Sequence, residues 1–421
     1  MPLTQQEIGR RLRLAREAAG LTQEQVAERV TLSRSAIAQM ELGNRAVNSI
    51  ELDRLAFLYG RDIRDFFSEE FAKDDSLGAL FRANQDLADR PATADALKRC
   101  VAAGRELSNL ERLVGVPNEF PAAVRYMVPE LKSRYDAIRQ GASLAEQERR
   151  RLNIGDAPIE DIADLLERQG IRTGLIELPD DVSGLTFVDR HIGPFAVINR
   201  NEHITRRNFS FAHEYAHVLA DRDAHGIISR TSDRAGLREV RANAFAANFL
   251  LPEAGVRQFL AELGKGGESR LLAETPVDDD QAIALEARGT SATHDIQLHH
   301  VALLAHHFGI SRVMALYRLR NLQILSERDV RILLEQERSG KGREVARLLD
   351  LPEPDHLTER NRFRHRFLSL ALEAFNREHI TRSKLEELFS MVLRRPKSEV
   401  SLEGYAVIAP DDPTGVLMPH K

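Results

Sequence analysis

The residues most able to do chemistry in this 421-residue chain are two histidines four positions apart, in the run His213-Glu214-Tyr215-Ala216-His217. Residues four apart on an α-helix share one face, so His213 and His217 would offer two imidazoles to one tetrahedral Zn²⁺. Glu214 would then lie beside the metal, where a carboxylate can take a proton from water. Tyr215 falls on the other side of such a helix, and we expect it to pack in the interior.

Two histidines do not hold a catalytic zinc, because such a site needs a third protein ligand and an open position for water. The alternative reading of the motif is an amphipathic helix whose histidines are merely solvated. Later in the chain, His299 and His306, like His300 and His307, are seven residues apart. Seven residues span two helical turns, too far for one ion, so we expect no second metal site there.

The sequence around the motif is also informative. The run Arg207 to His217 is followed by Glu239-Val240-Arg241-Ala242-Asn243-Ala244-Phe245-Ala246 and then by Leu250-Leu251-Pro252. This pairing resembles the ImmA/IrrE family of bacterial metallopeptidases over about residues 154–260, and more weakly as far as residue 319. The resemblance implies that Glu239 is the third ligand. We therefore expect one Zn²⁺ per chain, or Mn²⁺ in its place, with Glu214 as the general base. Asn243, one helical turn beyond Glu239, would either support a ligand or pack between helices.

A second motif lies near the N-terminus. The runs Leu21 to Ala27 and Ser33 to Glu41 resemble the helix-turn-helix of phage-repressor-like (Xre-type) regulators, over about residues 8–67. Ala27 and Ile37 would lie where the two helices touch. Thr31 departs from the pattern because glycine is usual at this turn, and a positive φ costs a β-branched residue about a kcal/mol or more. The shape of the turn therefore stays open.

In such a motif the second helix enters the major groove of a double-stranded DNA operator with its N-terminus first. Arg suits guanine and Gln suits adenine, while residues flanking the helices contact phosphates. Residues 1–65 hold ten Arg and nine Asp or Glu, a net charge of about +1, so tight binding is expected to need a homodimer. The predicted DNA-contacting residues are Gln23, Ser33, Arg34, Ser35, Ala38, Gln39, Asn44 and Arg45.

The periodicity predicts a mainly α fold with a small β-sheet, an α+β class. Strands are expected at residues 171–178, 184–188 and 195–199, the only β-rich part, and long helices at 203–220 and 237–251. Gly264 to Gly267 and Asp278 to Asp280 are expected to be loops. The expected domains are a five-helix helix-turn-helix domain (1–70), a helical connector (71–153), a zincin-like peptidase domain (154–320), a helical C-terminal region (321–395) and an extended tail (396–421).

The bulk composition narrows the function classes. The net charge of −5 argues against a basic nucleic-acid coat, so DNA binding must come from a local surface. The single cysteine, Cys100, can form neither an internal disulfide nor a cysteine-rich zinc site, and it fits a reducing compartment. Arginines interrupt the first 20 residues and no stretch has the ~20 apolar residues that span a bilayer, so we expect a cytoplasmic protein with no membrane partner.

Three functions compete at this point. The resemblance implies a regulator whose peptidase cleaves a repressor-like or antitoxin protein, in stress response or mobile-element control; the substrate would be the chain itself, a second copy or a separate partner. The second is a transcription factor without protease activity, whose zincin-like domain is a sensor or scaffold. The third function is that of an antitoxin, which only binds a toxin and its own operator. Glu214 argues for catalysis, because a purely structural metal site needs no base.

Overall fold

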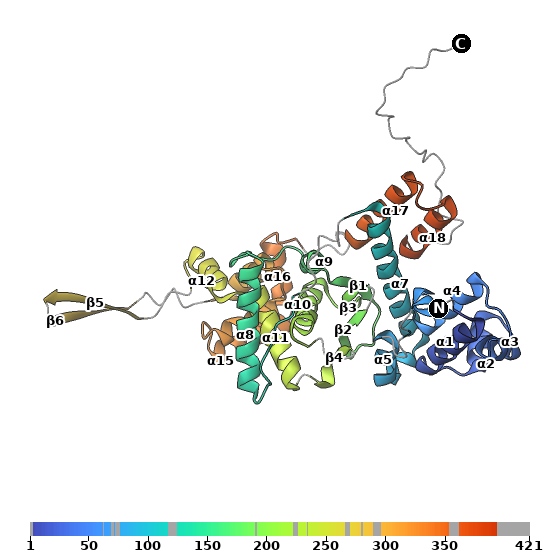
Figure 1. Cartoon of the computed structure of the whole chain (residues 1–421). Helices are drawn as coiled ribbons and strands as arrows, with labels where there is room; N and C mark the ends of the chain where they lie inside the picture. Colours follow the sequence, from blue (N-terminus) through green and yellow to red (C-terminus); the bar gives the residue numbers. More distant parts are fainter. Residues whose placement is uncertain are drawn as a thin grey trace, which may run out of the picture. The chain divides into compact units, whose positions relative to one another are not determined.

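The computed structural model describes residues 3–61, 63–68, 71, 76–116, 124–189, 192–221, 226–233, 235–265, 270–278, 281–288, 296–352 and 362–393. The chain divides into two compact units (Figure 1). Unit 1 comprises residues 1–121, 189–193 and 360–421, and unit 2 comprises residues 122–188 and 194–359. Unit 2 thus lies in the sequence between the first and last segments of unit 1, and residues 189–193 interrupt it. The predicted tail at 396–421 lies outside the described residues.

The N-terminal part of unit 1 has the five short helices expected of a helix-turn-helix domain, the last of them a 3₁₀-helix. Polar caps begin the four α-helices: Thr4, Thr22, Ser33 and Asn48 each accept a hydrogen bond from a backbone N–H in the first turn. The interior is apolar, with Leu12 and Ile37 each 1% exposed. The elements are α1 (Gln5–Ala18), α2 (Gln23–Val30), α3 (Arg34–Glu41), α4 (Ser49–Tyr59) and η1 (Ile63–Phe67).

The turn between α2 and α3 keeps the left-handed conformation in spite of its threonine. Thr31 has φ 59° and ψ 44° and follows α2 directly. The N–H groups of Thr31 and Leu32 donate to carbonyls in the last turn of α2, that of Leu32 to Ala27 at 2.9 Å. The turn that glycine usually makes is therefore present. Other interactions in the domain offset the steric strain of a β-branched residue at positive φ.

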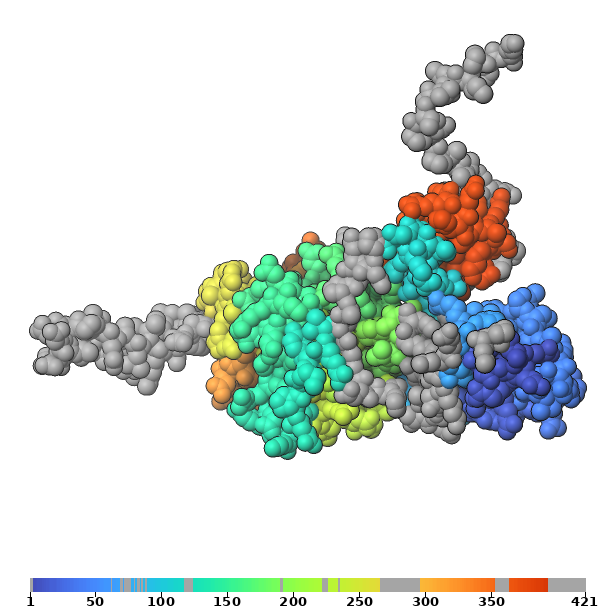
Figure 2. All heavy atoms as spheres, viewed as in Figure 1, coloured from blue at the N-terminus to red at the C-terminus, as the bar shows by residue number. Residues whose placement is uncertain are grey.

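The remaining helices of unit 1 join the two ends of the chain. Leu107 and Leu110 of α7 share a buried apolar cluster with Phe367, Leu385 and Leu388 of α17 and α18. Figure 2 shows this contact between the cyan end of α7 and the orange-red helices. Lys98 of α7 also donates to the carbonyl of Leu58 at 2.7 Å, which ties α7 to α4. The elements are α5 (Ser76–Ala83), α6 (Gln85–Ala88), α7 (Pro91–Val114), α17 (Arg362–Asn376) and α18 (Arg382–Leu393).

Unit 2 contains a mixed four-stranded sheet in the order β1-β3-β2-β4. Strands β1 (Arg172–Ile176), β2 (Val182–Asp189) and β3 (Gly193–Asn199) were expected, and β1 and β3 are parallel. The fourth strand, β4 (Ile227–Arg230), is antiparallel to β2 and was not expected, because four residues give no usable periodicity.

The expectation that residues 171–199 are the only β-rich part was wrong. β5 (Arg270–Asp278) and β6 (Gln281–Arg288) form a separate antiparallel hairpin around residues that were expected to be a loop. The run Gln281 to Arg288 is rich in Ala, Leu and Glu, which favour helices, so no strand signal was visible.

The helices of unit 2 pack closely around the sheet and around one another. Helix α10 begins at Ile204 and ends at Ala220, and α11 runs from Leu237 to Leu250, both close to the expected bounds. Helix α8 approaches α11 so closely that a Cβ atom at Gly141 would lie 2.4 Å from the carbonyl oxygen of Arg241. The other helices are α8 (Arg134–Arg151), α9 (Ile162–Arg168), η2 (Thr231–Asp233), α12 (Glu253–Glu262), α13 (Leu298–His307), α14 (Arg312–Asn321), α15 (Glu327–Arg338) and α16 (Lys341–Leu348).

Part of the core of unit 2 lies between α8, α10 and α11, and the same buried cluster continues into β3 and α12–α15. Tyr215 is fully buried there against the rings of Phe245 and Phe249, and its hydroxyl donates to Glu148. This confirms that Tyr215 packs on the opposite side of α10 from the histidines. None of the helices in the described ranges is long and apolar enough to cross a membrane.

Candidate metal centre

Helix α10 sets the spacing of the two histidines. Its first turn is capped by His203, and Phe211, Ala212 and Ala216 bury its apolar side. Because the helix is held on that side, His213 and His217 project together from another face, and the distance between their Nε2 atoms is 3.2 Å. The sequence-predicted pair is therefore in place.

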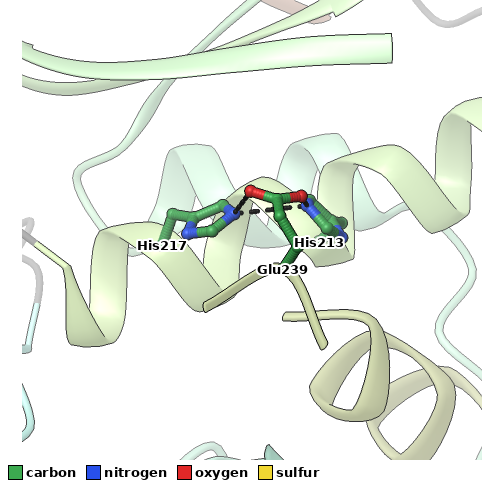
Figure 3. Close-up of side chains that lie close together, drawn as sticks. All are labelled: His213, His217 and Glu239. Atoms are coloured by element: carbon green, nitrogen blue, oxygen red, sulfur yellow. Dashed lines mark hydrogen bonds and ion pairs between the residues drawn. The ribbon is translucent and has the colours of Figure 1, made fainter. Parts of the chain in front are cut away.

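Glu239, in the first turn of α11, completes the cluster. Its Oε2 atom lies 3.1 Å from Nε2 of His213, and its Oε1 atom lies 3.3 Å from Nε2 of His217. Figure 3 shows the carboxylate set between the two imidazoles. The three ligand atoms lie within 4.8 Å of one another, and all three residues are buried. Among the described residues this is the one group of His, Cys, Asp or Glu close enough to share an ion, and none of the later histidines belongs to it.

The donor set fits a divalent ion. Two imidazole nitrogens and one carboxylate converge from two helices, the His₂Glu combination that leaves a fourth position for water or substrate. In this structure Glu239 is paired with both imidazoles, and a cation bound between the three groups would take the place of the shared protons. The residues present therefore suit a divalent ion, and Zn²⁺ stays the predicted one.

The far nitrogens of both imidazoles have partners of their own. His217 Nδ1 lies 2.9 Å from Oδ2 of Asp221, and His213 Nδ1 lies 3.1 Å from Oδ1 of Asn243. Arg241 donates to the other oxygen of Asp221. An oxygen acceptor at Nδ1 keeps the proton there and directs the lone pair of Nε2 toward the ion. Asn243 thus contacts His213. Asp221, one helical turn after His217, contacts the second histidine and was not predicted from the sequence, although its spacing was visible.

Electrostatics in the cluster favour a cation. Burial opposes the charged imidazolium of His217, but the hydrogen bonds that it donates to Asp221 and Glu239 outweigh burial and raise the pKa of His217 to about 10. Burial likewise opposes a charged Glu239, yet hydrogen bonds from His213 and His217 lower the pKa of Glu239 to about 2. The pKa of Asp221 is also lowered, by His217 and Arg241 against burial. A site that holds a proton among ionised carboxylates has the charge to hold a metal ion instead.

Glu214 lies next to His213 and is fully buried beneath strands β2 and β4. The hydroxyl of Thr186 donates to its Oε2 at 2.5 Å, and the hydroxyl of Ser229 donates to its Oε1 at 2.6 Å. Gly184 leaves room for the carboxylate, because a Cβ atom there would lie 2.7 Å from Oε1. No pattern in the sequence could reveal these partners, since they come from two strands that meet α10 only in the folded chain.

A cavity of about 440 Å³ opens onto the cluster. His213 and Glu239 form part of its wall. Phe209, Ala247 and Met314 give it an apolar part, and α14 supplies one side. Its remaining lining residues are Ser183, Thr205, Arg206, Ser210, Ser229, Arg230, Asn243, Ser311, Val313, Tyr317, Arg318 and Asn321.

The predicted DNA-contacting residues lie in and around α2 and α3. Arg34, Ser35 and Gln39 of α3 are exposed, and Ala38 is half-buried. Asn44 is exposed and donates to the Gln39 side chain at 3.0 Å. Ser33 serves as the N-cap of α3.

Gln23 and Arg45 have internal partners as well. The side-chain amide of Gln23 donates to Glu41 at 2.8 Å, in a group that also includes the Arg16–Glu41 ion pair at 2.6 Å. Arg45 forms an ion pair with Glu51 at 2.6 Å. Both residues are half-buried. Their contact with DNA phosphates stays a prediction.

Comparison with known families agrees with this geometry. Residues 166–320 match the model of the IrrE N-terminal-like domain, a zincin-like metallopeptidase family, and residues 7–65 match the model of a helix-turn-helix domain. No curated protein matches the chain. The chain therefore carries a helix-turn-helix domain of the kind that binds DNA and a metallopeptidase-type domain. In particular, it joins an N-terminal helix-turn-helix to an ImmA/IrrE domain.

Proposed function

We propose that this protein is a DNA-binding transcriptional regulator whose zinc-dependent peptidase domain cleaves a repressor-like or antitoxin protein. The observation that carries the proposal is the convergence of His213, His217 and Glu239 on one point, with Glu214 beside them. The helix-turn-helix domain on the same chain supports a role at DNA. It also means that the substrate could be a second copy of this chain, which carries such a repressor-like domain itself.

The chemistry follows from the positions of the residues. When bound, Zn²⁺, or Mn²⁺ in its place, would polarise the scissile carbonyl and make a nearby water more acidic. Glu214 takes a proton from the attacking water and returns it to the leaving amine. Thr186 and Ser229 hold the Glu214 carboxylate in place, and Asp221 and Asn243 hold the two imidazoles. The cavity next to His213 and Glu239 receives the peptide.

At the DNA, α3 enters the major groove of the operator, and Arg34, Ser35, Ala38 and Gln39 approach the bases. Ser33 at its N-terminus and Gln23, Asn44 and Arg45 near the backbone contact phosphates. Because the domain has little net positive charge, two copies bind a two-fold symmetric operator.

One observation favours a second function, sensing without hydrolysis. Both carboxylate oxygens of Glu214 already accept hydrogen bonds from hydroxyl groups, and Glu214 is not among the residues that line the cavity. In that case the metal centre would hold a ligand, and occupancy of the cavity would change DNA binding without peptide cleavage.

Cleavage assays separate the two functions. The zinc-loaded protein and its E214Q variant are each incubated with repressor-like proteins from the same genome and with a tagged second copy, and products are mapped by mass spectrometry. The matched control is D180N, at an exposed carboxylate outside the site. Cuts made by wild type and D180N but not by E214Q support the peptidase. DNA binding by all three with no cut supports sensing.

A further inference from the structure

One arginine in the cavity beside the metal centre is unusual in its surroundings. Arg318 of α14 lines the same cavity as His213 and Glu239, and it is 7% exposed. Its Nε donates to the carbonyl of Leu251 at 2.9 Å, and its Nη2 donates to Oδ1 of Asn248 at 2.8 Å. These bonds fix the guanidinium plane against the C-terminal end of α11, so the group is a rigid part of the cavity wall.

The third nitrogen of this guanidinium remains available. Nη1 of Arg318 donates to no group in the described part of the chain, and it is not among the polar atoms closed off from solvent there. Because Nη1 keeps some contact with solvent and Arg318 lines the cavity, we infer that this nitrogen faces the cavity. A ligand entering beside the metal ligands therefore meets a free N–H donor on a fixed cation.

The charge of Arg318 is also uncompensated. Both of its partners are neutral oxygens, and within the described ranges no carboxylate lies within ion-pair distance; Glu253 acts only from farther away. The other cavity arginines differ, because Arg206 pairs with Glu202 at 2.8 Å and Arg230 with Asp181 at 2.9 Å. Burial lowers the pKa of Arg318 to about 10, which still leaves it charged at neutral pH.

We propose that Arg318 binds the carboxylate of an acidic side chain, Glu or Asp, in the peptide held at the metal centre. A buried cation that lacks a counter-charge gains most from an anionic partner that arrives with the substrate. Phe209, Ala247 and Met314 supply an apolar surface for the methylene groups of a glutamate side chain. The proposal rests on the proposed function only in that the metal centre holds the peptide next to this subsite.

Hydroxamates of single amino acids test the subsite without knowledge of the natural substrate. The hydroxamate group anchors each probe on the zinc ion and the side chain samples the cavity. Binding of the α-hydroxamates of glutamate, glutamine and leucine to the zinc-loaded protein is measured by calorimetry. We expect the glutamate probe to bind about tenfold more tightly than the glutamine probe, the size of one charge-assisted hydrogen bond.

Variants then assign the preference to its residue. R318Q should bind the glutamate and glutamine probes equally, R318K should keep part of the preference, and R206Q, at a paired and exposed arginine of the same cavity, should keep all of it. Equal binding of the two probes by wild type, or a preference that survives in a folded R318Q, would overturn the proposal. If R318Q does not fold, the wild-type comparison and R318K decide.

The same measurements separate this proposal from the peptidase function. If the protein prefers the glutamate probe but cuts no peptide, the subsite proposal is supported and the peptidase proposal is contradicted. Should the chain bind no zinc, N-acetylglutamate amide and N-acetylglutamine amide are compared by their effect on the melting temperature of wild type and R318K. A larger stabilisation by the glutamate compound in wild type supports the subsite, and equal stabilisation overturns it.

Discussion

The Oε1 atom of Glu214 lies where Gly184 has no side chain, only 2.7 Å from the place a Cβ atom would take. Oε1 is also the atom that accepts the hydrogen bond from Ser229. The position of the carboxylate next to the metal ligands thus depends on the absence of one methyl group from strand β2.

Replacing Gly184 by alanine tests that dependence. We expect G184A to displace the Glu214 carboxylate and to lower the rate of peptide cleavage at least about tenfold, since a misplaced base is a poor one. Zinc content should stay at one ion per chain because the three ligands are untouched. Kinetics and metal analysis of the same preparation give the answer. T186S, which keeps its hydroxyl, is the control with near-normal rate; an unchanged rate in G184A would show that Glu214 is not the base.

Asp221 should govern how tightly the ion is held. In D221N the amide no longer supplies a charged acceptor for Nδ1 of His217, so we expect the affinity for zinc to fall by about 10- to 100-fold. Competition with a fluorescent chelator measures it. D180N removes the same charge from the surface and should bind zinc as wild type does. Equal affinities of the two variants would remove Asp221 from the metal site.

Zinc binding should depend on pH with a definite sign. The pKa of His217 is raised to about 10, so in the metal-free site this imidazole carries a second proton throughout pH 6–8. Zinc must displace that second proton from Nε2 in order to bind. The affinity for zinc should therefore rise by about tenfold per pH unit over this range, with about one proton released per ion. Calorimetry in buffers of different ionisation enthalpy measures the protons. An affinity independent of pH would contradict the proton on His217.

Thr31 should limit the stability of the helix-turn-helix domain. An L-residue in the left-handed region loses about 1–2 kcal/mol, whereas glycine loses less there but has more entropy when unfolded. We expect T31G to stabilise the domain by about 0.5 kcal/mol, seen as slower hydrogen exchange in α2 and α3. T22A, which removes the cap of α2, should destabilise it by about 1 kcal/mol. Faster exchange in T31G would mean that the threonine side chain contributes more than its backbone strain.

Arg34 should matter for DNA more than other exposed arginines. Its side chain is 68% exposed at the N-terminus of α3, and its carboxylate neighbour, Glu24, is 3.7 Å away. We expect R34A to lower the affinity for an operator selected from random duplex DNA by about tenfold or more. R13A removes an equally exposed arginine from α1 and should have a small effect. Similar losses in both variants would point to a general effect of charge.

The parts of the molecule that sequence could predict are those held by local spacing. The histidine pair follows from helical periodicity, and the caps Thr22 and Ser33 mark the starts of α2 and α3. Glu239 was reached through a family resemblance, because nothing in its own segment says that α11 folds back on α10. The partners of Glu214, Thr186 and Ser229, lie 28 and 15 residues away along the chain and meet it only through the sheet. Arg318 is 79 residues beyond Glu239, and only the packing of α14 brings it to the cavity.

The apolar cluster between α7 and α17–α18 bears on any self-cleavage. The metal-binding unit is joined to its neighbour by four covalent crossings, the first of them after α7 and the last before α17. A single cut at the first crossing would give two fragments that stay associated through this apolar cluster. One fragment contributes Leu107 and Leu110 of α7, and the other contributes Phe367, Leu385 and Leu388 of α17 and α18. A cut at this point would therefore not release the helix-turn-helix domain, because release also requires these buried side chains to be exposed to water. The cleaved regulator would then stay on its operator.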